Sequence, residues 1–193
     1  MVSAVALGRI TLGRITRNRS LLVAVLASLV VFAAGFALGF GSIGRGWAQS
    51  SLGAGGATNA VFGSSVFAIL AQNLIAVMFL YSGVLTFGLT SVLSIGMVSI
   101  YVGATMAVGV TNSGWTQMAG ATGVYALLEF AGCILAAAAG LYPGCAFLAH
   151  VVKDDAAFGR YLDAVATSLK ILGCAVALIL TAAAIEAVVI AIR

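Results

Sequence analysis

Two glutamates stand inside long apolar runs of this sequence, and an ionisable side chain there needs a physical reason. Glu129 is the only charged residue between positions 119 and 142, and Glu186 lies in the last apolar run. If these runs cross a bilayer, each carboxylate costs roughly 2.5 to 3.5 kcal/mol unless it is protonated, hydrogen-bonded or open to water. The polar residues Gln72 and Asn73 lie in another apolar run. We therefore predict an internal polar cluster of Glu129, Glu186, Gln72 and Asn73.

This cluster has a structural and a functional interpretation. The groups could satisfy one another and set the helix register, or they could accept a proton or bind a peptide. Under the functional interpretation Glu129, Glu186 and Tyr125 are the candidates for acid–base catalysis. No Walker, GxSxG, HExxH or paired-cysteine zinc motif occurs, which excludes an ATPase domain within the chain. His150 and Asp154, at i and i+4, are too few for a metal, so we predict neither a metal nor a cofactor.

The composition places these runs in a membrane protein. Of 193 residues, 63% are hydrophobic and 7% charged, which leaves too little polar surface to cover a soluble core. The net charge of +4 does not indicate nucleic acid, because four of the nine basic residues precede position 20 and no aromatic residues alternate with them. The predicted class is an all-α, multi-pass transmembrane helix bundle in the bilayer.

Polar breaks divide the chain into about five spans. Residues 1–19 form a basic N-terminal segment, and residues 20–193 form one transmembrane domain. We expect a break near 88–94, a second at 111–117, and a helix end at Pro143-Gly144. The predicted spans are 20–41, 61–88, 92–111, 119–142 and 169–192.

Charge distribution orients this topology. With the N-terminus in the cytoplasm, seven of the nine basic residues are inside and two, Arg45 and Arg193, are outside. The inverted orientation would reverse these numbers, so the positive-inside rule favours a cytoplasmic N-terminus and an external C-terminus.

Small residues predict how the helices pack. On a helix, Gly132, Ala136 and Gly140 share one face with Glu129, and they would let a neighbouring backbone approach closely. That neighbour should be the span with Glu186 or the span with Asn73, while the first span, rich in Leu, Val and Phe, should be peripheral. Comparable small stripes are Ser99/Gly103/Ala107 and Gly173/Ala177/Thr181.

Three segments together resemble the stage II sporulation protein M family. They are EFAGCILAAAAGLYPG (129–144), QNLIAVMFLYSGVLTFG (72–88) and AAAIEAVV (182–189). They are similar to the family's Glu-containing Ala/Gly signature, its Asn-Asn start with spaced glycines, and its closing Ile-Glu-Ala segment. The sequence departs from the family at positions 124–126, where Val-Tyr-Ala replaces the usual Pro-His-Gly.

The resemblance implies a bacterial cytoplasmic-membrane protein without an established catalytic mechanism. Founding members of the family act with peptidoglycan hydrolases in sporulation, and others accompany exporters in clusters for ribosomal peptides such as circular bacteriocins. We therefore expect a non-catalytic subunit of a hetero-oligomeric envelope complex, with a membrane or peripheral protein partner. A homodimer is a further arrangement. The alternative is a membrane-embedded enzyme, or half of one, that modifies a hydrophobic peptide substrate.

Overall fold

The computed structural model describes residues 4–47, 66–149 and 157–192, and these residues lie in helices or in the turns between them. The helical segments are α1 (Ala4–Leu38), the π-helical turn η1 (Gly39–Ile43), α3 (Val66–Tyr81), the 3-10 turn η3 (Ser82–Leu85), α4 (Leu89–Ser113), α5 (Trp115–Leu148) and α6 (Ala157–Ile192). No strand occurs in the described ranges. The predicted all-α class is confirmed.

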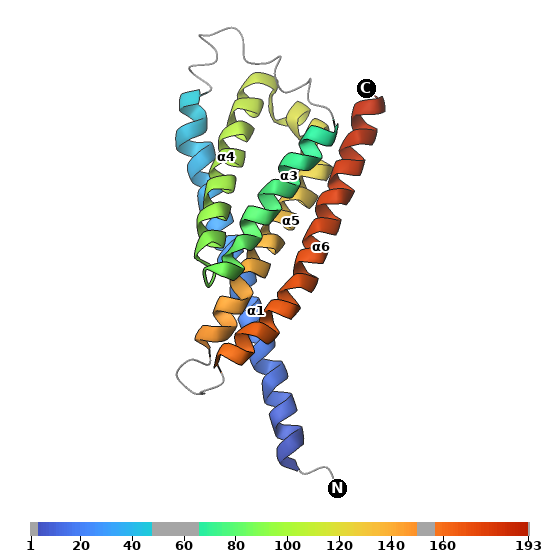
Figure 1. Cartoon of the computed structure of the whole chain (residues 1–193). Helices are drawn as coiled ribbons and strands as arrows, with labels where there is room; N and C mark the ends of the chain where they lie inside the picture. Colours follow the sequence, from blue (N-terminus) through green and yellow to red (C-terminus); the bar gives the residue numbers. More distant parts are fainter. Residues whose placement is uncertain (1–3, 48–65, 150–156, 193) are drawn as a thin grey trace.

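The helices alternate in direction along the bundle, and the two chain ends lie at opposite ends of it (Figure 1). Four helices are long and apolar enough to cross a bilayer, and α3 with η3 is a shorter apolar segment. From Val66 to Leu85 this segment is about 30 Å long, the thickness of a hydrocarbon core. The protein is thus a multi-pass helical bundle. The end of the bundle at which α1 begins is called the N-terminal end, and the opposite end is called the C-terminal end.

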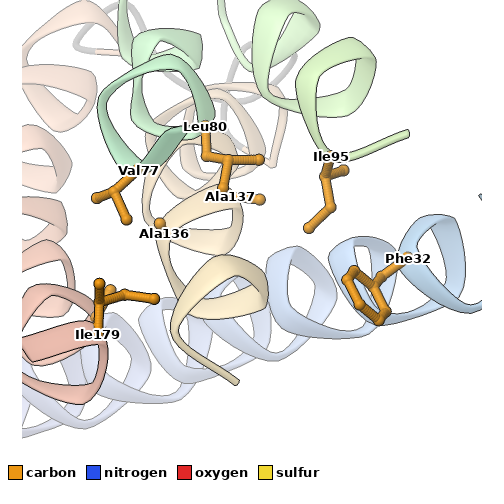
Figure 2. Close-up of a cluster of buried hydrophobic side chains, with 8 residues drawn as sticks. Phe32, Val77, Leu80, Ile95, Ala136, Ala137 and Ile179 are labelled. Atoms are coloured by element: carbon orange, nitrogen blue, oxygen red, sulfur yellow. The ribbon is translucent and has the colours of Figure 1, made fainter. Parts of the chain in front are cut away.

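Helix α5 is the central helix. It contacts α1, α3, α4 and α6, and 61% of its apolar window is buried, against 22 to 28% in the other three long helices. Ala136 to Ala139 are each 0% exposed, because side chains this small allow neighbours to close in on every side. Figure 2 shows α1, α3, α4 and α6 each contributing a large side chain around this run. These side chains are Phe32, Val77, Leu80, Ile95 and Ile179.

Helix α1 is peripheral, as its composition predicts. One of its faces carries the buried residues Ala24, Ser28 and Phe32 toward the bundle, while Val30 on the other face is 65% exposed. A bilayer accepts such a Leu- and Val-rich surface without cost, so this face needs no protein partner.

Glycines on both helices bring α1 and α4 close together. A Cβ atom on Gly39 would lie 2.9 Å from the Cα of Ile100, and one on Gly103 would lie 2.9 Å from the backbone nitrogen of Phe40. The N–H of Gly44 donates to the carbonyl of Gly39, five residues back, which makes η1 a π-turn. The extra residue keeps Gly44 on the face that meets α4, where a Cβ would meet Ala107. The π-turn therefore extends the glycine contact past Leu38.

The expected helix end at Pro143-Gly144 is wrong. Helix α5 runs through Pro143 to Leu148. Proline removes one intrahelical hydrogen bond, but membrane helices tolerate this where neighbours enclose the backbone. Pro143 is fully buried, and a Cβ on Gly144 would overlap the Phe87 carbonyl, so the α3–α4 turn covers this point of α5.

Other boundaries also differ from the predicted spans. Helix begins at Ala4 and continues into the first span, so the described part of the basic segment is not separate from α1. Helix α6 begins at Ala157 rather than at position 169, and its first turns carry Arg160, Asp163 and Lys170. All three side chains are exposed, and exposed positions of a helix need no apolar residues. The turn before α4 is at Phe87 (φ 52°) and Gly88 (φ 100°), at the near edge of the expected break. His150 and Asp154 lie outside the described residues.

Candidate intramembrane polar site

The polar site lies where α3, α5 and α6 meet. Asn73 of α3 donates from Nδ2 to Oε1 of Glu129 in α5, at 3.0 Å. Both side chains are half-buried. An amide that donates to a carboxylate makes one of the stronger protein hydrogen bonds, and here it joins residues 56 positions apart. This bond ties the central helix to the shortest one.

Glu186 approaches the same site from α6. It is half-buried and close enough to Glu129 for the two carboxyl groups to interact electrostatically. Two ionised carboxylates at this site would repel each other. Within the described residues no Lys or Arg pairs with Glu129, and its polar neighbours on other helices are Asn73 and Glu186.

Gln72 does not join these three residues. Its side chain is exposed, and among the described residues no hydrogen bond connects it to Asn73, Glu129 or Glu186. Successive residues of a helix point about 100° apart, so Gln72 and Asn73 cannot both face α5. The sequence could not show which of the two would do so without knowledge of the buried face of α3.

Two further side chains of α5 flank Glu129. Tyr125, the third catalytic candidate, is half-buried one turn before it. Cys133, one turn after it, is close enough to interact electrostatically with the carboxyl group. Cys133 is not part of the predicted cluster, although its i+4 spacing from Glu129 is a usable signal. The sulfur adds a polarisable, weakly polar neighbour to the site.

Small residues of α5 set the helix spacing around the site. A Cβ on Gly132 would lie 2.8 Å from Cδ1 of Ile179 in α6, so α6 packs directly on this glycine. A Cβ on Gly140 would lie 2.7 Å from the carbonyl oxygen of Leu80 in α3. Ala136 lies between them and is buried. The face that carries Glu129 therefore lies between the two helices that supply Asn73 and Glu186.

A second polar group, which sequence reasoning missed, joins α3, η3, α4 and α6 near the N-terminal end. The hydroxyls of Tyr81 in α3 and Ser168 in α6 share a hydrogen bond of 3.0 Å. Tyr161 of α6 donates to the carbonyl of Val84, and Ser91 of α4 donates to that of Leu80. Hydroxyls inside apolar spans were the available signal, because such groups seek partners on neighbouring helices.

The chemistry available at the site is narrow. A half-buried carboxyl group with one amide donor can hold a proton, release it, or accept a hydrogen bond from a peptide group. Among the described residues no three His, Cys, Asp or Glu side chains gather as a metal site would require. The three cysteines are free thiols.

Comparisons with known proteins identify no relative. No family model matches the chain, and no curated protein or solved structure matches it.

Proposed function

We propose that this protein is a non-catalytic integral membrane subunit of a bacterial envelope complex. It resides in the cytoplasmic membrane, and its partner is an exporter, a peptide-maturation enzyme or a peptidoglycan hydrolase. The proposal combines the resemblance to the stage II sporulation protein M family with one observation, the outward face of α6.

That outward face contains a seam rich in small residues. It runs along α6 in steps of three and four residues, the spacing of a helix-packing seam, and each position in it is exposed. A Cβ on Gly159 or Gly173 would meet nothing within 4 Å, so the groove along the helix is open. The seam consists of Gly159, Asp163, Ala166, Lys170, Gly173, Ala177, Leu180 and Ala184.

The contrast with α1 supports a protein partner for this seam. The outward face of α1 carries large apolar side chains such as Leu22, Leu26 and Val30, which suit contact with lipid tails. Gly and Ala along α6 present little side-chain surface to lipid but allow another helix backbone to approach closely. The seam on α6 is therefore a surface that favours helix docking.

In this proposal Glu129 has a structural role. Its hydrogen bond with Asn73 sets the register of α3 against α5, and Glu186 borders the same contact. A rigid bundle held in this way can present α6 in a constant orientation to its partner.

Purification from the native membrane in mild detergent tests the proposal. We expect the chain to elute with a second protein at fixed stoichiometry. Ala177→Leu should fill the seam and release that protein, while Val30→Leu on the outward face of α1 should leave the complex intact. Elution as a lone monomer would overturn the proposal. Loss of the partner with both variants would show that α6 has no special part in binding the partner.

The alternative is a membrane-embedded enzyme, or half of one, acting on a hydrophobic peptide. The interaction between Glu129 and Glu186 favours it, because a carboxyl pair can hold one proton and pass it to a substrate. Glu129→Gln keeps the shape and the capacity for a hydrogen bond from Asn73 but removes the acid. Loss of product formation with an intact complex would support catalysis, and unchanged product formation would eliminate it.

A further inference from the structure

The first turns of α1 concentrate positive charge at one end of the protein. Four arginines follow one another along this continuous helix, which projects past the other helices at the N-terminal end (Figure 1). They are Arg9, Arg14, Arg17 and Arg19. The sequence has no Asp or Glu before Glu129, so α1 contains no carboxylate that could pair with them.

The remaining charges near this end do not neutralise the arginines. Before position 20 and from position 150 to 170, the sequence contains seven basic and three acidic residues. Helix α1 begins at this end, and α6 also begins there after α5 has ended. Elsewhere two basic and two acidic residues balance, so these two stretches account for the whole net charge of +4. Such an end attracts an anionic partner.

The uncharged part of α1 and η1 brings the arginines to the edge of the lipid phase. No charge occurs from Ser20 to Gly44, within a stretch that is long and apolar enough to cross a bilayer. This uncharged helix is about 38 Å long, and a hydrocarbon core of about 30 Å fits inside it with about 8 Å to spare. The hydrocarbon therefore begins within about 8 Å of Arg19. Arg14 lies only about 8 Å further along the axis, which is within one Debye length at physiological salt.

One face of α1 combines a cation with an apolar surface. Arg19, Leu22, Leu26 and Val30 follow one another in steps of three and four residues, and all four are exposed. A phospholipid whose acyl chain lies along Leu22 and Leu26 would have its phosphate beside Arg19. Arginine binds phosphate through paired hydrogen bonds, so the helix matches both parts of such a lipid.

From this charge and its position beside an exposed apolar face, we propose that the N-terminal part of α1 binds anionic phospholipid headgroups. Four or more basic residues beside a membrane-spanning helix are typical of such binding, and each residue near the surface adds roughly fivefold to the preference. A nucleic acid or an acidic protein would pair with the arginines alone, whereas a lipid also covers the leucines next to Arg19. The inference goes beyond the proposed function and requires no protein partner.

Quenching of tryptophan fluorescence by brominated lipids tests this inference on the purified full-length chain. Vesicles contain phosphatidylcholine and phosphatidylglycerol in equal amounts, and one of the two is brominated on its acyl chains. Trp47 and Trp115 are changed to Phe, and a single reporter, Leu26→Trp or Leu38→Trp, is introduced. Leu26 is seven residues from Arg19, and Leu38 is seven residues from the lone Arg45 at the other end of the uncharged stretch. Both leaflets have the same composition, so the orientation of the chain does not affect the result.

The two reporters should differ in lipid preference at low ionic strength. We expect the preference for phosphatidylglycerol over phosphatidylcholine to be at least about fivefold larger at Leu26→Trp than at Leu38→Trp. About 1 M salt should abolish the difference, because the Debye length falls to about 3 Å.

Changes to the arginines then locate the source of the preference. Changing all four N-terminal arginines to Gln should lower the preference at Leu26→Trp at least about fivefold, whereas changing them to Lys should preserve it within about threefold. Arg45→Gln should leave the preference at Leu26→Trp unchanged. Gln and Lys form helices about as well as Arg does, so the helical content by circular dichroism should be the same in all variants.

Three outcomes would overturn the inference. The first is an equal lipid preference at the two reporters, and the second is a preference that survives the four Arg→Gln changes. The third is the absence of any lipid preference together with nucleic acid or an acidic protein that purifies with the chain and is lost after these changes. Because the vesicles contain this chain alone, failure of the inference leaves the proposed protein complex untouched.

Discussion

Adding one methyl group to Gly39 should separate α1 from α4, and this tests whether the glycine contact holds the bundle together. The Cβ of Gly39→Ala would overlap the Ile100 carbonyl oxygen and lie 2.8 Å from its carbon and 2.9 Å from its Cα. These are backbone atoms of a helix, so they cannot move aside as a flexible side chain would. The two helices must move apart along the whole contact.

Gly41 provides a matched control in the same π-turn. A Cβ at Gly41 would meet nothing within 4 Å, so Gly41→Ala adds the same atoms without a clash. Overpacking should make Gly39→Ala cost about 1 to 3 kcal/mol of unfolding free energy. Gly41→Ala should be neutral or stabilising by up to about 1 kcal/mol, because alanine favours helix over glycine.

Reversible unfolding in mixed micelles, followed by far-UV circular dichroism, measures both variants. We expect their unfolding free energies to differ by at least about 1 kcal/mol, with Gly39→Ala the less stable. Gly103→Ala, on the α4 side of the contact, should behave like Gly39→Ala, because its Cβ would overlap the Phe36 carbonyl. Equal stability of the Gly39 and Gly41 variants would refute the close packing of α1 on α4.

Three further predictions concern the site and the helix register. Gly132→Leu should cost about 1 to 3 kcal/mol by overpacking the α5–α6 contact, measured by the same unfolding assay. Asn73→Ala should cost about 1 to 3 kcal/mol by removing the donor to Glu129, and a change below the error of the assay would mean that this bond is unimportant. Deleting Ser42 should be tolerated, because it turns the π-turn into an α-turn and keeps the glycines on the face that meets α4. Deleting Ala34 should disrupt the α1–α4 contact, because it rotates the residues on one side of the deletion by about 100°.

Hydropathy and charge predicted the class and the approximate spans, because these depend on local composition. The exact helix ends depend on tertiary contacts, so the sequence predicts them less well. Pro143 is a helix breaker in isolation, yet it lies within α5 because surrounding helices enclose its backbone. The π-turn at Gly39–Ile43 leaves no hydropathy signal, since it shifts the register without changing composition.

The polar site illustrates the same limit at the level of single residues. Glu129 and Asn73 were predicted to meet, and they share a hydrogen bond. Gln72 was predicted to join them and is exposed instead. Polar character alone predicts that both Gln72 and Asn73 join the site. Only the orientation of α3 on α5 shows that Asn73 faces Glu129 and Gln72 does not.

Small-residue stripes have two different meanings within this one chain. Gly132, Ala136 and Gly140 of α5 are buried by α3 and α6, whereas Gly173 and Ala177 of α6 are exposed. In sequence the two stripes look alike, because spacing and residue size do not record which neighbour is present. The stripe on α5 already packs against helices of the same bundle. The stripe on α6 is exposed, so a helix of another protein could pack against it. Assembly should therefore begin on α6, and substitutions there should affect association before they affect folding.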